Sequence, residues 1–162
     1  MKNIFRTSVL LVLAASSLVG CGSSHFSGKW NFSDITDVTI APSVSEDIIE
    51  AYKEHYGVSD VAGVEAAALA SFKEQGLFAS SYINFAGKYT YAYDVALERE
   101  STWVFFQTSE NEGFLSFYSE IDPSEGNPDP EIFPPIVYNP ETDNMYMTYT
   151  YTAFMFTIEF VR

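Results

Sequence analysis

The chain contains one cysteine and two histidines among its 162 residues, and few basic side chains. A single cysteine excludes a disulfide framework and a zinc site built from several Cys and His ligands. Eight Lys and Arg against 22 Asp and Glu give a net charge of −14, without a basic cluster, which excludes nucleic-acid binding. His25 precedes the first patterned segment and His55 falls at a helix end, so neither predicts a nucleophile–base pair. We therefore expect no enzyme activity and no cofactor.

Apolar and aromatic residues are abundant instead. Hydrophobic residues make up 47% of the chain, and 14 Phe, 11 Tyr and 2 Trp make up the aromatic share of 17%. This content suffices for a hydrophobic core and excludes a disordered acidic tail. Because no internal repeat, low-complexity tract or linker divides the chain, we predict one folded domain.

The first twenty residues differ from the rest. Lys2 and Arg6 precede an apolar run over residues 8–19, which is too short to span a bilayer comfortably. The Leu-Val-Gly-Cys sequence that ends at Cys21 resembles the lipobox of bacterial lipoprotein signals. The resemblance implies a signal peptide over residues 1–20, cleavage before Cys21, diacylation of its thiol and acylation of the new N-terminus with chains such as palmitate. An uncleaved anchor helix and a secreted protein with a free thiol are the alternatives.

Residues 21–25 form a short lipidated tether ahead of the domain, which we place at residues 26–162. At about 3.5 Å per residue, the segment from Gly22 to His25 reaches about 14 Å, so the domain is expected close to its bilayer. In the lipoprotein family, the Gly at position 22 in place of Asp favours the outer membrane. We expect a bacterial cell-envelope protein that is lipid-anchored to the outer membrane, on its periplasmic or its surface face.

Two helices are predicted after an initial strand region. Residues 26–40 alternate loosely between apolar and polar side chains and predict one or two strands. The Ser43–Glu46 spacing matches a capping box ahead of a helix over residues 44–56. A second amphipathic helix is predicted over residues 60–75, and the glycine after each helix is its expected end.

The apolar period then changes to two, which predicts strands. The predicted strand segments are 89–97, 102–108, 113–121, 132–138 and two final strands over 145–152 and 154–160. Residues 110–113 form a hairpin connection in which Gly113 is available for positive φ. Residues 122–135 contain five prolines and cannot form a central strand. Seven or eight strands with an early helical pair predict a mainly β (α+β) fold, an antiparallel meander barrel with two helices inserted after the first strand.

The Gly28-Lys29-Trp30 sequence in the first predicted strand resembles the opening of the lipocalin and fatty-acid-binding families. In those families the Trp closes one end of the barrel and a basic residue of the last strand packs across its ring, so the resemblance implies a contact between Trp30 and Arg162. The helical pair is similar to the two helices that cover fatty-acid-binding barrels, and the whole pattern resembles the lipocalin-like lipoproteins of Bacteroidetes. A second lipocalin motif like T-D-Y is absent, as are paired basic residues for a fatty-acid carboxylate.

Aromatic side chains are the candidate ligand contacts. Tyr89, Tyr91 and Tyr93 share one face of a predicted strand, and Trp103 lies on the next. Tyrosines in such a stripe can stack on sugar rings, while the alternative is that they fill a sheet face through cross-strand packing. Residues 137–142, followed by Tyr-Thr-Tyr at 149–151, are similar to the final hairpin of Bacteroidetes surface glycan-binding domains.

Acidic residues provide candidates for two further kinds of site, a metal site and a catalytic pair of carboxylates. The oxygen-bearing residues of one loop are Asp122, Glu125, Asn127, Asp129 and Glu131. They are of the kind that Ca²⁺ binds, but their order does not match an EF-hand, so we interpret the loop as an exposed acidic segment and predict no metal site. Carboxylate pairs suited in kind to glycoside hydrolysis are Glu98/Glu100, Glu110/Glu112 and Glu120/Asp122. Solvated strand ends explain these pairs equally well.

These observations lead to three hypotheses. The first is a non-enzymatic, membrane-anchored lipoprotein whose lipocalin-like barrel holds a small apolar or amphipathic ligand among interior Phe and Tyr side chains, or whose pocket is vestigial. The second is a surface carbohydrate-binding accessory module that uses exposed tyrosines. The third is a structural envelope protein without a ligand, which docks to a basic partner through its acidic surface.

Overall fold

The structure, a computed structural model, describes residues 25–86, 89–94, 98–117 and 134–162. The elements are β1 (Gly28–Ile40), α1 (Glu46–Tyr56), α2 (Val61–Gln75), β2 (Tyr82–Ala86), β3 (Tyr89–Asp94), β4 (Arg99–Gln107), β5 (Glu112–Phe117), β6 (Pro135–Asn139), β7 (Asn144–Tyr151) and β8 (Phe154–Val161). The predicted signal peptide over residues 1–20, Cys21 and the acidic loop over residues 122–131 lie outside the described residues. Of the helices described, none has the length and apolar content needed to cross a membrane.

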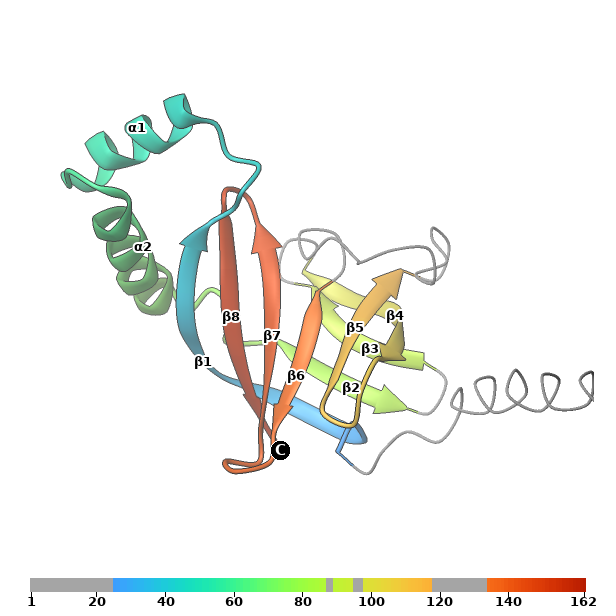
Figure 1. Ribbon diagram of the computed structural model, residues 1–162. Helices are drawn as coiled ribbons and strands as arrows, with labels where there is room; N and C mark the ends of the chain where they lie inside the picture. Colours follow the sequence, from blue (N-terminus) through green and yellow to red (C-terminus); the bar gives the residue numbers. More distant parts are fainter. Residues whose placement is uncertain (1–24, 87–88, 95–97, 118–133) are drawn as a thin grey trace, which may run out of the picture.

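The strands form one closed barrel. Each pairs antiparallel with the next in the chain, and β8 returns to pair with β1 (Figure 1). β1 has two neighbours along its 13 residues, because Gly28–Asn31 pairs with β2 and Asn31–Ile40 pairs with β8. Two register irregularities in the β1–β8 ladder allow β1 to bend between these neighbours. The predicted fold class is therefore confirmed: a mainly β antiparallel meander barrel with two helices after its first strand.

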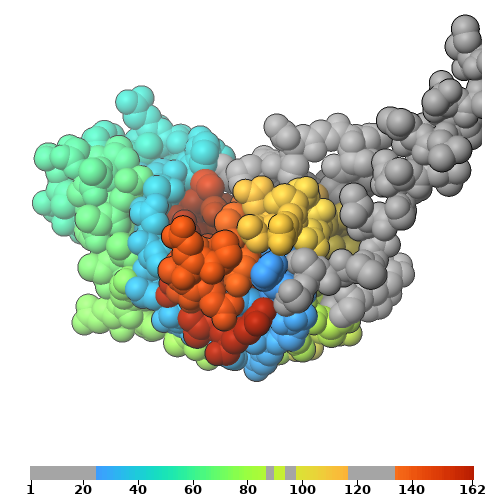
Figure 2. All heavy atoms as spheres, turned by 60° about the horizontal axis from the view of Figure 1, so that its bottom comes forward, coloured from blue at the N-terminus to red at the C-terminus, as the bar shows by residue number. Residues whose placement is uncertain are grey.

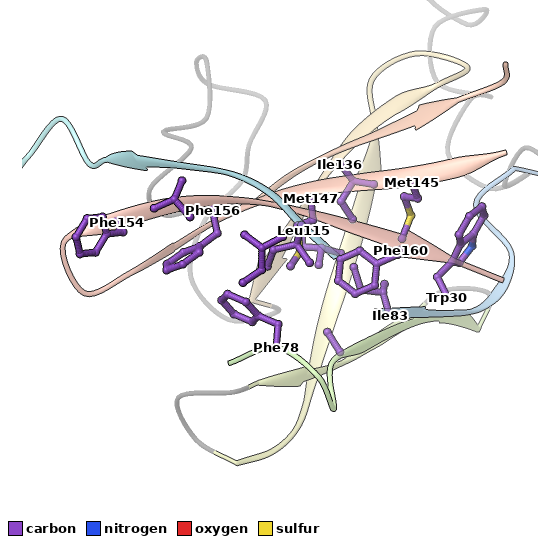
Figure 3. Packing of buried hydrophobic residues seen from close by; sticks show 14 of the residues in the cluster. Trp30, Phe78, Ile83, Leu115, Ile136, Met145, Met147, Phe154, Phe156 and Phe160 are labelled. Atoms are coloured by element: carbon purple, nitrogen blue, oxygen red, sulfur yellow. The ribbon is translucent and has the colours of Figure 1, made fainter. Parts of the chain in front are cut away.

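The core fills the inside of the barrel (Figure 3). In β8, every second residue from Phe154 to Phe160 is at most 1% exposed, while the residues between them are half-buried. The large, fully buried side chains are Trp30, Phe78, Phe154, Phe156, Phe160, Ile35, Ile83, Leu115, Ile136, Met145, Ile158 and Val64. The described core begins at Phe26, and the ring of strand pairs closes within residues 28–161. The part of the chain that follows Cys21, residues 22–162, therefore contains all the strands of the barrel.

The helical pair covers one end of the barrel. α2 lies beside the second half of β1, and α1 lies farther out (Figure 1). The rings of Phe72 on α2 and Tyr52 on α1 have their centroids 5.5 and 5.0 Å from that of Phe154. Val64 and Ala68 of α2 are fully buried, whereas no residue of α1 is. The burial of α2 shows that it packs more closely on the barrel than α1 does.

The helix ends match the sequence in part. The predicted Ser43–Glu46 capping box is wrong, because α1 begins at Glu46 with Ser45 as its N-cap, and the Ser45 side chain makes no capping hydrogen bond. α2 is capped by Asp60, whose carboxylate accepts a hydrogen bond from the Gly63 N–H at 2.7 Å. Both helices end at the expected glycines, which adopt the left-handed conformation that favours this residue.

The hairpin between β4 and β5 needs its glycine for a reason the sequence did not indicate. The prediction of positive φ at Gly113 is wrong, since the described glycines with positive φ lie elsewhere. Instead the ring of Phe105 lies against Gly113, and a Cβ at this position would overlap that ring and come within 2.6 Å of the Phe106 carbonyl oxygen. Close approach of a neighbouring aromatic ring, rather than backbone conformation, excludes a side chain here.

We therefore predict that Gly113→Ala lowers the free energy of unfolding by about 1–3 kcal/mol, because the added methyl group displaces the Phe105 ring and strains the β4–β5 pair. Urea denaturation of the wild-type and variant proteins measures the change. Glu112→Ala, at the exposed neighbouring position, is the control and should stay within about 0.5 kcal/mol of wild type. Equal stability of the Gly113→Ala protein and the wild type would contradict the explanation.

Candidate functional site

The barrel has two distinct ends. The start of the described chain, the β4–β5 hairpin, the β6–β7 turn and the C-terminus gather at one of them, and Figure 2 shows the blue start and the red end of the chain meeting on this face. We call it the closed end and define it by His25, Trp30, Tyr138 and Arg162. The opposite end, here called the open end, carries the helical pair and the α2–β2 connection.

The closed end is held by a contact between the first and last strands. The guanidinium carbon of Arg162 lies 4.6 Å from the centroid of the fully buried Trp30 ring. The Arg162 Nη2 also donates a hydrogen bond to the His25 carbonyl oxygen at 3.0 Å. Gly28, the first residue of the G-x-W sequence, has φ of 74°, a conformation that favours glycine. The structure thus brings Gly28, Trp30 and Arg162 to the same end of the barrel.

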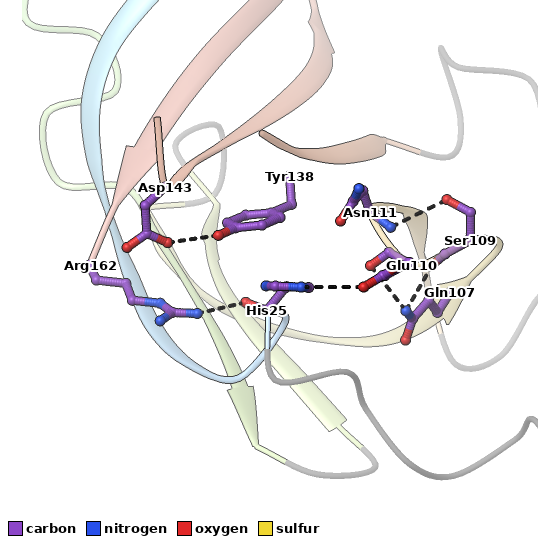
Figure 4. A network of polar contacts seen from close by, with 8 residues as sticks. All are labelled: His25, Gln107, Ser109, Glu110, Asn111, Tyr138, Asp143 and Arg162. Carbon is purple, nitrogen blue, oxygen red and sulfur yellow. Dashed lines mark hydrogen bonds and ion pairs between the residues drawn. The ribbon is translucent and has the colours of Figure 1, made fainter. Parts of the chain in front are cut away.

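His25 belongs to this end rather than to a free tether (Figure 4). Its ring stacks on Tyr138 with centroids 4.4 Å apart, and its Nε2 lies 3.7 Å from the Glu110 carboxylate. The Tyr138 hydroxyl donates to the Asp143 carboxylate at 3.0 Å. Burial, then this hydrogen bond, raises the pKa of Tyr138 above its ordinary value, while nearby Arg162 opposes the shift. The last residue of the tether predicted over residues 21–25, His25, is therefore packed against the barrel.

A pocket lies at the open end. It is lined by Phe78, Ser81, Tyr82, Ile83, Ala92, Tyr93, Trp103, Leu115, Pro134, Met147, Tyr149 and Phe160. Its cavity volume is about 30 Å³, and all the space between its atoms amounts to about 410 Å³ when open solvent is included. Sites for drug-sized molecules usually have cavity volumes about ten times as large. A ligand here would therefore occupy the mouth, since the interior is already filled by side chains.

Ser81 contributes a polar atom to this apolar pocket. It precedes β2 and shares the inward register of Ile83 and Phe85, and its side chain is 7% exposed. Its backbone is fixed, because its N–H donates to the Phe78 carbonyl at 2.8 Å and its C=O accepts from the Phe32 N–H at 3.0 Å. The Ser81 Oγ has no hydrogen-bond partner among the described residues. A buried hydroxyl without a partner favours a site at which something else binds.

Tyr91 of β3 does not lie where the leading hypothesis expected it. Its neighbours Thr90 and Ala92 point inward, at 1% and 7% exposed, whereas Tyr91 and Tyr93 are half-buried. The expectation that this stripe lines the interior is wrong for Tyr91. Tyr93 shares the outward register but still contributes to the lining of the open-end pocket. The side chain of Tyr89 lies outside the described part.

The register of β3 and β4 explains this orientation. Trp103 is 5% exposed, points inward and is paired in register with Thr90, while Ala92 is paired with Ile83. Bulky side chains on the neighbouring strands leave room only for small residues on the inner face of β3. A tyrosine on the outer face keeps its hydroxyl near water while its ring packs on the sheet.

The outer face next to Tyr93 is already covered by other side chains. Tyr82 lies 6.3 Å from Tyr93 between ring centroids, and the Lys29 Nζ lies 4.0 Å from the centroid of the Tyr82 ring. The Tyr82 hydroxyl donates a hydrogen bond to the Glu100 carboxylate. This hydrogen bond, then burial, raises the pKa of Tyr82 above its ordinary value. Tyr91, on the same outer face, has no such ring contact or side-chain hydrogen bond among the described residues.

The acidic and histidine candidates do not assemble into a site within the described residues. No group of three or more His, Cys, Asp or Glu side chains there could hold a metal ion. The pairs Glu98/Glu100 and Glu110/Glu112 are exposed, and Glu120/Asp122 lies outside the described part. His55 sits in the last turn of α1, with its ring 4.8 Å from that of Tyr56.

Sequence reasoning missed the α2–β2 connection, which supplies Phe78 and Ser81 to the pocket. The alternation Ser81-Ile83-Phe85 was the one available signal, and it is short because β2 has only five residues. Pocket residues of other strands, such as Leu115 and Met147, follow from the period of two once the register is known.

Comparison of the chain with known protein families, with curated proteins and with solved structures finds no match.

The closed end yields a prediction about stability. Arg162→Ala should lower the free energy of unfolding by about 0.5–2 kcal/mol, because it removes the guanidinium from the Trp30 ring. Urea denaturation measures this loss. Arg99→Ala, which removes an exposed arginine from β4, is the matched control and should change stability by less than about 0.5 kcal/mol. If both variants unfold at the same urea concentration, the Trp30–Arg162 contact does not stabilise the barrel.

Proposed function

We propose that this protein is a non-enzymatic lipoprotein of the bacterial cell envelope whose barrel binds a small apolar or amphipathic ligand at its open end. The observation that carries the proposal is the apolar pocket among Phe78, Trp103, Leu115 and Met147, which opens at the end opposite Trp30 and Arg162. Small-molecule sites are typically concave and mostly apolar, with a few polar groups that fix orientation. The barrel is lipocalin-like in this sense, because one end is closed by a Trp–Arg contact and the other offers the pocket.

The size of the pocket restricts the ligand. Sites for drug-sized molecules usually measure about 300–1,000 Å³. The hollow reaches about 410 Å³ only when open solvent is included, and its cavity volume is about 30 Å³. A small molecule, or one end of a longer molecule that projects from the mouth, fits this shape. A fatty acid fully enclosed in the barrel does not, because Phe156, Phe160 and Met145 fill that space.

The membrane anchor is the part of the proposal that depends on the sequence. The lipobox ending at Cys21 supports acylation, and His25, four residues later, lies on the closed end. Those four residues span at most about 14 Å. We propose that the lipid chains hold the protein in the outer membrane, since three acyl chains bind a bilayer far more strongly than one.

Carbohydrate binding at the surface is the second candidate, and the position of Tyr91 favours it. Tyr91 lies on the outer face of β3, where the residue is half-buried. Sugar rings stack on such aromatic faces. Against this candidate, Tyr82 on the same outer face is covered by Lys29 and bonded to Glu100. A structural role without a ligand is the third candidate and is what remains if neither site binds anything.

Native mass spectrometry of the processed protein from its own host tests the leading proposal. We expect a retained noncovalent apolar adduct, and we expect Ala92→Leu to remove it because the larger side chain fills the pocket. Ala68→Leu crowds the core under α2 to a similar extent without touching the pocket and should retain the adduct. An adduct-free wild-type protein, or an adduct that survives Ala92→Leu, would contradict the proposal.

Affinity electrophoresis in gels that contain envelope or capsular polysaccharides tests the second candidate. If a glycan binds on the outer face of β3, Tyr91→Ala should abolish the retardation, because the stacking surface is lost, at about 1 kcal/mol or more. Tyr146→Ala removes a half-buried tyrosine from the outer face of β7 and serves as the control. Retardation that both variants retain, or that neither the variants nor the wild type shows, rules out a glycan site at Tyr91.

A further inference from the structure

The open-end pocket combines an apolar lining with one buried hydroxyl that has no partner. The Ser81 Oγ is out of contact with solvent and without a hydrogen bond among the described residues. Its backbone groups are both bonded, so the side chain is held on a fixed stretch of chain and shares the inward register of Ile83. Buried polar atoms in folded proteins are nearly always hydrogen-bonded, and an exception points to a missing partner.

The described part of the lining also lacks charged side chains. Among its described residues there is no Asp, Glu, Lys, Arg or His. An ionised carboxylate in such a place would lose its hydration without gaining a cation or several N–H donors, which is a large cost. The chain as a whole carries a net charge of −14, which also disfavours the approach of an anion. The pocket is therefore suited to a neutral molecule.

We infer that the ligand of the open-end pocket is an uncharged, largely apolar molecule with one hydrogen-bonding group, such as an alcohol, and that this group binds the Ser81 hydroxyl. The inference rests on the proposed ligand-binding function and specifies its ligand class. A serine hydroxyl both donates and accepts, so an alcohol or a carbonyl compound can complete its hydrogen bonding. The apolar part of the ligand then lies against Leu115, Met147 and the Phe78 ring.

The test compares hexan-1-ol with hexanoate at pH 7, using residues 22–162. These two probes have chains of the same length and differ in charge. Binding is followed by NMR through the methyl groups of Ala92 and Met147, which line the pocket, with the methyl group of Ala68 under α2 as the internal reference. We expect saturable shifts of the Ala92 and Met147 signals with hexan-1-ol and at least tenfold weaker binding of hexanoate.

Two matched variants isolate the hydroxyl. Ser81→Ala should weaken the binding of hexan-1-ol about fivefold, the value of one neutral hydrogen bond. Thr150→Ala removes another buried hydroxyl that has no partner among the described residues but does not line the pocket, and should bind like the wild type. The methyl spectrum of each variant without ligand, compared with that of the wild type, shows whether its barrel is intact.

The outcomes separate the inference from the function on which it rests. Binding of hexanoate as tight as that of hexan-1-ol overturns the neutral ligand class but leaves ligand binding in place. Unchanged binding of hexan-1-ol by a folded Ser81→Ala protein overturns the role of Ser81. Absence of shifts at Ala92 and Met147 with both probes, together with an adduct-free protein from the host, overturns the proposed function itself.

Discussion

The pairing of the first strand with the last is the constraint on which the rest of the structure depends. β1 must reach two neighbours that are far apart in sequence, and it does so by bending after Asn31, where its pairing passes from β2 to β8. Once this ring is closed, each strand is paired with a neighbour on both sides along part of its length, and the inward-facing residues of the strands share a common interior. The contact between Trp30 and Arg162 lies where the two terminal strands meet, so it stabilises the closure itself.

Much of this arrangement could be predicted, partly from local period and partly from a resemblance. The period of two in residues 145–160 separates the two faces of β7 and β8. The resemblance of the Gly28-Lys29-Trp30 sequence to the lipocalin opening implies the contact between Trp30 and Arg162. The orientation of Tyr91 could not be predicted, because a period of two defines two faces without saying which lies inside. Local pattern favours the larger side chains for the inner face, whereas the bulk of Trp103 on the neighbouring strand β4 leaves room only for the smaller ones.

The candidate site was harder to predict than the fold. Ser81 lies in a connection with no period of its own, and its burial depends on how the loop after α2 returns to the barrel. Phe78, from the same connection, fills interior space that a wider barrel would leave for a ligand, with its ring centroid 5.0 Å from that of Phe156. The interior of a barrel of eight strands can be filled by side chains, as Phe78 and Phe156 do here.

The docking of His25 has a geometric consequence. Because its carbonyl is bonded to Arg162 and its ring is stacked on Tyr138, the chain leaves the barrel at a fixed point on the closed end. With acyl chains on Cys21, that point would be held within a few residues of the headgroups, and the barrel could not turn over. The entrance beside Phe78 and Ser81 would then face the aqueous side, so a ligand would arrive from solution rather than by lateral diffusion out of the lipid leaflet.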